Sequence, residues 1–329
     1  MAAAPQIAIV GAGLAGLRLA HELSDVAKVT VFEKSRGLGG RMSTRRADAF
    51  QFDHGAQYFT AHGPAFQGFL APFIKMGTVQ EWRPHVVRLS ASGPQDVDWS
   101  APRYVATPGM TGLCKELAKA LTIVSGTQIT NLEREGQGWQ LTSLEGTDYG
   151  PFDWVLSTAP HPQTLDLMPD TFAEVDALKA VKMQGCYSLM LGFEAEVDLG
   201  WQAAIVSQGP LAWLAVNSSK PERPAHFSLM VQSSNDWADA HLDDDQSAVQ
   251  ATLLEAVGAL TGLAVETASY VSLHRWRYAK VSTPASKDHL IDAVSQLGSA
   301  GDWCGAGRVE AAFDSATALA RAVRGHLDG

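Results

Sequence analysis

Hydrophobic residues change their spacing along the first 32 positions of the chain. Residues 6–10 form an apolar run rich in β-branched side chains, which predicts a buried strand. Residues 17–24 have helix-forming composition with apolar positions on one face, so we expect a helix there. Residues 29–32 predict a second short strand. The order strand, helix, strand is typical of an α/β fold with a parallel sheet.

The next part of the chain mixes helical and strand patterns. We expect a helix near residues 65–76, a hairpin around Gly93, and a helix of about ten residues that ends at Leu121. Residues 123–130 alternate as one strand that returns to the first sheet, and residues 139–142 and 154–157 predict two more strands. The turn Thr158–Pro160 either passes close to a ligand bound at the end of that sheet or is a plain loop.

Residues 161–285 have a different character, because short apolar runs follow one another without long helices between them. Such runs indicate an antiparallel sheet, and they cover residues 186–193, 204–206, 212–216 and 227–232. A helix over residues 246–260 is expected to cover one face of this sheet. A strand near residues 297–300 and a helix over residues 310–326 then return the chain to the first sheet.

A glycine motif connects the first predicted strand to the first predicted helix. Gly11 permits a tight turn, Gly13 lets a pyrophosphate approach the backbone around Ala12, and Gly16 lets the helix pack closely on the strand. The free N–H groups and the positive end of the helix dipole would face the phosphates. Glu33 ends the second strand 20 residues after Gly13, where a carboxylate binds an adenosine ribose. The motif predicts a dinucleotide site.

A basic loop and an aromatic turn follow this motif. Residues 34–41 combine three glycines, one of them Gly40, with the cations Lys34, Arg36 and Arg41. Glycines bring the backbone close to a ligand and guanidinium groups offer forked donors, so the loop suits a pyrophosphate. Residues 52–59 (FDHGAQYF) then place polar and aromatic groups together in one turn.

Charge and cysteine content narrow the classes of partner. The 329 residues carry a formal net charge of −10, which argues against nucleic acid or an anionic membrane as partner. No basic, long apolar leader begins the chain, and no run has the length of a membrane helix, so we expect a cytoplasmic protein. The three cysteines are widely spaced, which fits a reducing compartment and argues against a thiol redox centre.

Together these motifs resemble those of the flavin-dependent amine-oxidase-type superfamily. The glycine motif, Glu33, and the segments RGLGGR (36–41) and DHGAQYF (53–59) carry the resemblance, and HRWRYA (274–279) and GDWC (301–304) fit it. Within the superfamily, the pattern is most similar to that of the bacterial renalases. The resemblance implies an α/β fold with a Rossmann-like FAD-binding domain and a second, mainly antiparallel substrate domain, as in p-hydroxybenzoate hydroxylase and the amine oxidases.

Both predicted domains are discontinuous in sequence. We expect residues 1–62, 103–160 and 286–329 to form the FAD-binding domain. Residues 63–102 and 161–285 are expected to form the substrate domain, which covers the flavin. The chain shows no internal repeat and no flexible linker that would separate the two parts.

The expected cofactor is non-covalent FAD, with Cys304 as a bystander. Asp302 is either a ligand of the ribityl hydroxyls or only a turn residue, and the helix after it would point its N-terminus at the flavin edge that becomes negative on reduction. The resemblance implies that Ile129 gives adenine a backbone contact. The predicted cofactor-binding residues are Gly11, Ala12, Gly13, Gly16, Glu33, Lys34, Arg36, Gly40, Arg41, Gln57, Tyr58, Ile129, Asp302 and Arg308.

The expected substrate reduces the flavin directly, because the chain has neither a second nucleotide motif nor a cysteine pair. The resemblance to renalases implies oxidation of the 2-dihydro and 6-dihydro isomers of NAD(P)H to β-NAD(P)⁺, with O₂ reduced to hydrogen peroxide. Hydride transfer needs proximity and a dry pocket but no protein nucleophile, and we expect no metal. Predicted substrate contacts are Tyr58, Phe59, Trp99, Tyr187, Trp276 and Arg308, with Tyr278 and Arg277 as further candidates.

Two other functions stay open. An amine oxidase would need an aromatic cage and usually a lysine near the flavin, for which Lys182 and Lys280 are the candidates. A flavin-binding protein without turnover would show no reduction by small donors. His54 and His274 are expected to be structural.

Overall fold

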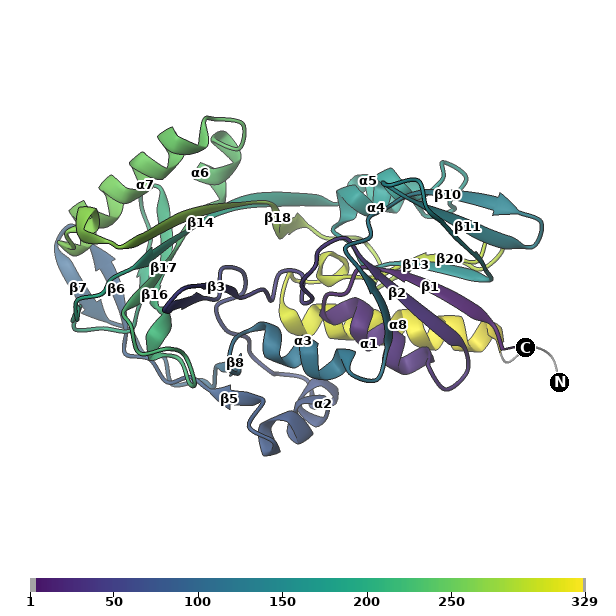
Figure 1. The fold of residues 1–329 in the computed structure, drawn as a ribbon, viewed down its shortest axis with the longest axis horizontal. Coiled ribbons are helices and arrows are strands. Elements are labelled where there is room, and N and C mark those ends of the chain that lie inside the picture. The colour runs from purple at the N-terminus through teal and green to yellow at the C-terminus, as the bar shows by residue number, and fades with distance from the viewer. Residues whose placement is uncertain (1–3, 328–329) are drawn as a thin grey trace.

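A six-stranded sheet forms one half of the molecule. The computed structural model describes residues 4–327 and arranges them around two large sheets (Figure 1). The strand order of the first is β19-β20-β13-β1-β2-β9, and all neighbours are parallel except β19 and β20. Its strands are β1 (Gln6–Val10), β2 (Lys28–Glu33), β9 (Thr122–Ser125), β13 (Trp154–Ser157), β19 (Leu290–Asp292) and β20 (Leu297–Ser299).

Helices cover one face of this sheet and a smaller sheet covers the other. Because successive side chains of a strand point to opposite faces, Ile7 and Ile9 pack with the helical side while Ala8 packs with the other. The helices are α1 (Leu14–Leu23), α3 (Thr111–Ala118) and α8 (Val309–Leu327). The opposite cover consists of β10 (Ile129–Glu135), β11 (Gly138–Ser143), β12 (Asp148–Phe152), α4 (His161–Leu167) and α5 (Val175–Ala180).

A seven-stranded sheet forms the second half, in the order β18-β14-β17-β16-β15-β6-β7. Its neighbours are antiparallel except β15 and β6. The strands are β6 (Val86–Ser90), β7 (Gly93–Asp96), β14 (Lys182–Gly192), β15 (Ala203–Val206), β16 (Leu211–Val216), β17 (Ser228–Ser233) and β18 (Tyr270–Thr283). The helices α6 (Asn235–Ala240) and α7 (Gln246–Thr261) lie on its outer side (Figure 1).

The remaining elements connect the two halves. The helix α2 (Pro64–Lys75) packs on α8 through Phe66 and Phe313, whose ring centroids lie 5.1 Å apart. The other elements are the pairs β3 (Arg45–Ala47) with β4 (Phe50–Phe52) and β5 (Val79–Glu81) with β8 (Tyr104–Ala106), and the 3₁₀ turns η1 (Asn217–Ser219), η2 (Val265–Thr267) and η3 (Asp302–Cys304).

The prediction of a single strand over residues 123–130 is wrong. The chain turns at Gly126, which adopts a φ of +71° that favours glycine. The strand β9 before it joins the first sheet, as expected, but β10 after it starts the separate three-stranded sheet. A short alternating pattern does not reveal such a change of sheet, because both strands keep the same period of two.

The fold class is confirmed, while the division into two domains stays a prediction. The expected strands of both sheets and the helices α1, α2, α7 and α8 are present. The unexpected strands include β12, which contains Gly150 and Pro151, the long β18, whose many polar residues hide its period, and the three-residue strands β3, β4, β5, β8 and β19. No helix within residues 4–327 has the length and apolar character needed to cross a membrane.

Candidate active site

One cavity of about 1060 Å³ runs from the glycine motif to the second sheet. It starts where β1 and β2 end, at the carboxyl edge where open α/β sheets bind ligands. It continues to β14, β16, β17 and β18. Pockets for a single small ligand usually enclose about 300–1,000 Å³. The cavity can therefore hold a dinucleotide together with part of a second molecule.

The glycine motif forms the first wall of the cavity. Gly11 has a φ of +109°, and a Cβ on Gly16 would lie 1.9 Å from the Gly11 carbonyl oxygen. Both glycines are therefore needed for the turn and for the close contact of helix and strand. At Gly13, in contrast, a Cβ would meet nothing within 4 Å, and this residue lines the cavity. Gly16 packs inside the protein, so its role is in packing rather than in ligand contact.

Glu33 is fixed beside this turn. Its side chain accepts hydrogen bonds from the backbone N–H of Ala12 at 2.9 Å and of Ser35 at 2.8 Å. Glu33 lines the cavity, and its two carboxylate oxygens have further lone pairs for hydroxyl groups. The N–H of Ala12 is thus taken by Glu33, and Ala12, unlike Gly11 and Gly13, does not line the cavity. The predicted cofactor contact of Ala12 has no free N–H in this arrangement.

The basic loop folds back onto the glycine turn. The Gly39 N–H donates to the Ala12 carbonyl at 3.0 Å, and Lys34, Gly40 and Arg41 line the cavity. Arg36 is exposed and does not line it, because the loop turns this side chain outward. Three of the four predicted phosphate contacts from this loop are therefore at the cavity, and Arg36 is not.

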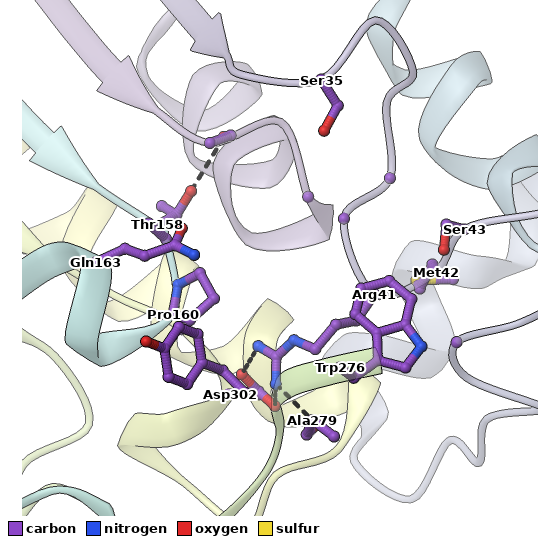
Figure 2. A pocket seen from close by; sticks show the side chains of 18 of the residues that line it. Ser35, Arg41, Met42, Ser43, Thr158, Pro160, Gln163, Trp276, Ala279 and Asp302 are labelled. Carbon is purple, nitrogen blue, oxygen red and sulfur yellow. Dashed lines mark hydrogen bonds and ion pairs between the residues drawn. The ribbon is translucent and has the colours of Figure 1, made fainter. Parts of the chain in front are cut away.

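Arg41 joins the early part of the chain to its last segment. Its guanidinium forms a two-pronged ion pair with the Asp302 carboxylate, with one N–O distance of 2.9 Å, and also donates to the Ala279 carbonyl at 3.2 Å. Figure 2 shows Arg41 pointing from its loop toward Asp302 and Ala279. Asp302 lies in η3 rather than at a strand end, and it lines the cavity together with Arg308 at the start of α8.

Two histidines and a tryptophan form a wall at the other end of the cavity. His54 stacks on Trp276 with centroids 5.3 Å apart, and His274 meets both rings edge to face. Trp276 Nε1 donates to the His54 carbonyl at 2.8 Å. Burial lowers the pKa of His54 to about 3, helped by His274 and Arg45, and burial also lowers the pKa of His274. Both imidazoles are thus neutral near pH 7 and line the cavity, and their structural role stays a prediction.

Tyr187 and Phe59, two of the predicted substrate contacts, do not line the cavity. Tyr187 follows Cys186 on β14, and Cys186 faces the cavity. Because neighbouring side chains of a strand point to opposite faces, Tyr187 points away from the cavity, and its hydroxyl donates to the His241 carbonyl at 2.8 Å. Phe59 packs in the core against Phe66.

Tyr58 and Trp99 lie behind a residue that the sequence did not single out. Trp213 lines the cavity, and its ring centroid is 5.7 Å from those of both Tyr58 and Trp99. The strand pattern of residues 211–216 could have indicated the position of Trp213, because residues 213 and 215 point to the same face of the strand. The predicted direct contacts from Tyr58 and Trp99 are therefore replaced by Trp213.

Gln57 belongs to a buried ion cluster rather than to the cavity wall. Asp53 lies between Lys220 and Arg223, with N–O distances of 3.2 Å and 2.7 Å, and all three side chains are fully buried. The Gln57 side chain accepts from Lys220 Nζ at 3.3 Å. We refer to Asp53, Gln57, Lys220 and Arg223 as the Asp53 cluster. Sequence reasoning missed it because its cations lie over 160 positions after Asp53.

The cysteines offer no reactive thiol. All three are free and buried, and burial raises the pKa of Cys114 and Cys304 to about 12 and that of Cys186 to about 11. Cys304 does not line the cavity. Within residues 4–327, no group of histidine, cysteine and acidic side chains is arranged to hold a metal ion.

The charge of the cavity is opposite to that of the whole chain. Its acidic lining residues are Glu33, Asp166 and Asp302, against twice as many cations. These cations are Lys34, Arg41, Arg275, Arg277, Lys280 and Arg308. Arg275 and Arg277 flank Trp276 on β18 and therefore point to its other face, where Arg275 donates to the Leu242 carbonyl and Arg277 pairs with Asp243. The remaining four positive and three negative side chains give a local excess of one positive charge, in a protein whose net charge is −10. Such a cavity attracts anionic molecules.

Comparison with known proteins agrees with this architecture. Residues 9–73 match the family described as NAD(P)-binding Rossmann-like domain. Residues 80–324, well over half of the chain, match the family described as flavin containing amine oxidoreductase.

Similar curated proteins match only a short part of the chain. An uncharacterised protein of Methanocaldococcus jannaschii is 41% identical over 70 residues, or 21% of this chain and 17% of its own length. The 4,4'-diapophytoene desaturase (4,4'-diaponeurosporene-forming) of Staphylococcus aureus is 34% identical over 76 residues, or 20% of this chain and 15% of its own length. The chain thus spans less than a fifth of the length of these relatives.

Solved structures share the fold over the whole chain. A protein from Exiguobacterium sp. 255-15, provisionally assigned as a protoporphyrinogen oxidase, has a TM-score of 0.81 at 13% identity and covers 100% of both chains. Putrescine oxidase bound to putrescine has a TM-score of 0.72 at 12% identity and covers 98% of this chain and 99% of its own. With the family match over residues 80–324, the chain belongs to the flavin-containing amine oxidoreductases, and its cofactor is FAD.

Proposed function

We propose that this protein oxidises 2-dihydro or 6-dihydro isomers of NAD(P)H to β-NAD(P)⁺, as renalases do. The donor ring gives up a hydride, and O₂ later takes the two electrons with two protons to form hydrogen peroxide. FAD supplies the hydride acceptor when it is bound. The unpaired, buried cysteines fit the reducing cytoplasm as its location.

The reversed charge of the cavity is the observation that carries this proposal. FAD itself brings a pyrophosphate, and Arg41 and Lys34 lie beside the glycine turn that would receive it. Lys280 lies instead on β18 and Arg308 at the start of α8, and both line the cavity, whereas the predicted substrate contact Arg277 pairs with Asp243 on the other face of β18. Their position leaves cationic groups for a second anionic molecule, such as a nicotinamide dinucleotide.

The cradle for FAD would use residues from both ends of the chain. Gly13 offers space for the phosphates, Glu33 would accept from the ribose, and Arg41, held by Asp302, would present its guanidinium to the cofactor. Ile129 and Arg308 also line this cavity. The first turn of α8 lies there too, so its N-terminus can favour negative charge on the cofactor.

The wall of His54, His274 and Trp276 suits a nicotinamide ring. Flat aromatic side chains hold a planar ring at low entropic cost. The ring becomes positively charged when it loses a hydride. Because burial keeps the pKa of His54 at about 3, this imidazole adds no opposing positive charge near pH 7. The wall therefore excludes water without repelling the product.

The test is anaerobic mixing of the FAD-loaded protein with purified 6-dihydro-NAD, 2-dihydro-NAD, benzylamine and putrescine. We expect the dihydronicotinamides to bleach the visible flavin band and to yield β-NAD⁺ in equal amount, while the amines leave it unchanged. Arg308→Gln should raise KM for these donors, whereas Arg46→Gln, an exposed arginine outside the cavity, should not. Bleaching by amines alone would reject the proposal.

An amine oxidase is the competing proposal, supported by the family and by the similarity to putrescine oxidase. Lys280 lines the cavity, as the lysine of such an enzyme would, whereas Lys182 does not. The excess of cations disfavours a protonated amine. A flavin-binding protein without turnover would be bleached by none of the four compounds.

A further inference from the structure

The Asp53 cluster holds one carboxylate and two cations away from water. Asp53 is 0% exposed, Lys220 2% and Arg223 8%. Arg223 donates to the Asp53 carboxylate through both Nε, at 3.2 Å, and Nη2, at 2.7 Å. The other carboxylate oxygen accepts from the Thr44 hydroxyl at 2.8 Å and the Met110 N–H at 2.9 Å. Asp53 and Arg223 thus form a satisfied pair, and Lys220 adds a second cation.

Lys220 has few other partners. Its ammonium lies 3.2 Å from Asp53 Oδ2 and 3.3 Å from Gln57 Oε1, and 5.3 Å from the centre of the Trp82 ring. Of the charged groups, only Asp53 and Arg223 face it within residues 4–327, and Gln57 and Trp82 are neutral. The cluster therefore keeps a net charge of one positive unit while Lys220 is protonated.

This charge lies directly behind the cavity wall. Asp53 is followed by His54, Gly55 and Ala56, which line the cavity. Gln57 donates to the Gly55 carbonyl at 3.1 Å, so the group that accepts from Lys220 also holds the lining segment. The Ala56 N–H in turn donates to the Arg41 carbonyl at 2.8 Å, and a Cβ on Gly55 would lie 2.0 Å from that oxygen.

We propose that Lys220 is a positioning residue whose buried charge, acting through residues 53–57, favours the reduced form of the bound flavin. A hydride brings two electrons and one proton, so the cofactor becomes more negative by one unit when it is reduced. A fixed positive charge in a water-poor site stabilises that added charge. The inference depends on FAD binding but not on the identity of the hydride donor.

Burial lowers the pKa of Lys220 to about 8, against the raising effect of Asp53. The charge of the cluster is therefore present at pH 7 and is lost as the pH rises through about 8. The stabilisation of reduced flavin by Lys220 should therefore disappear as the pH rises through about 8.

The experiment measures the midpoint potential of FAD in the holoenzyme, reduced by dithionite against a reference dye. Across the lining segment, at an effective dielectric constant of about 20, a buried unit charge changes such an equilibrium on the order of tenfold. In Lys220→Met we expect the ratio of reduced to oxidised flavin at a fixed applied potential to fall about tenfold, ~30 mV for a two-electron couple. Lys220→Arg, which keeps the charge, should stay close to the wild type.

Two results would overturn the inference. One is an unchanged potential in Lys220→Met with FAD still bound. The other is a wild-type potential without an additional pH-dependent step near 8, and this measurement needs no variant. An equal fall in Lys220→Arg and Lys220→Met would assign the effect to packing and also reject the charge. None of these outcomes depends on which molecule the enzyme oxidises, so failure of the proposed function would be seen separately.

Discussion

Arg41 and Asp302 lie 261 positions apart and meet in one ion pair at the cavity. The same guanidinium also donates to the Ala279 carbonyl at 3.2 Å, which belongs to β18. Three distant segments are thus joined by a single side chain. The cavity is therefore complete only when the last part of the chain has folded back onto the first.

Replacing Arg41 tests how far this pair supports FAD binding. Arg41→Lys keeps the charge but loses the forked geometry, and Asp302→Asn weakens the pair from the other side. Loss of one charge-assisted hydrogen bond costs about 1.5–3 kcal/mol, so we expect FAD to bind roughly 10- to 100-fold more weakly in both variants. Titration of the apoprotein with FAD measures this. Arg46→Gln is the control, and wild-type affinity in Arg41→Lys would contradict the prediction.

Replacement by alanine should affect the stability of the protein differently at Gly16 and at Gly13 of the glycine motif. In Gly16→Ala the new Cβ would lie 1.9 Å from a backbone oxygen, so helix and strand must separate. Overpacking of this kind costs about 1–3 kcal/mol or more, and we expect a lower Tm with or without FAD.

Gly13→Ala is the matched variant. Its Cβ would meet nothing within 4 Å, and its φ of −76° suits any residue, so the Tm of the apoprotein should not change. The methyl group would instead occupy the space where a pyrophosphate approaches, and FAD affinity should fall. A lower apoprotein Tm for Gly13→Ala than for Gly16→Ala would contradict this assignment of roles.

The first half of the site could be predicted because its chemistry is local. The glycine turn, Glu33 and the basic loop lie within 31 consecutive residues, and strand, turn and helix fix their relative positions. Arg36 shows the limit of this reasoning. Composition places an arginine in the loop, but the turn of the backbone decides whether it faces the cavity.

The substrate half depends on which face of a strand each side chain occupies. Tyr187 and Cys186 are neighbours, and only Cys186 faces the cavity. The aromatic content of the segment was visible in the sequence, but its register against β18 was not. The Asp53 cluster was also hidden, because nothing in the sequence around Lys220 and Arg223 indicates that both side chains are buried against one aspartate.

His54 should make the protein sensitive to mild acid. Its pKa is about 3 in the folded protein and 6.5 when unfolded, so protonation favours the unfolded chain. Stability is full above pH 6.5 and falls as the pH drops toward 3. At pH 5 the expected loss from this residue is about 2 kcal/mol.

Urea unfolding at pH 7 and pH 5 measures this loss. His54→Phe should reduce the difference between the two pH values, and His62→Gln, at an exposed position, should leave it unchanged. The same pH dependence in His54→Phe and wild type would show that other groups cause the acid sensitivity.

Removing Asp53 should destabilise the Asp53 cluster strongly, and less so when Lys220 is removed with it. Asp53→Asn leaves Lys220 and Arg223 buried without a counter-charge, and removing one partner of a buried ion pair costs about 3–5 kcal/mol. Asp53→Asn combined with Lys220→Met removes one of these two charges, so we expect the double variant to be more stable than Asp53→Asn alone. Denaturant unfolding of the four proteins gives the coupling free energy between the two positions. The exposed change Asp98→Asn is the control. Additive losses from Asp53→Asn and Lys220→Met would show that the two groups do not interact as their 3.2 Å contact requires.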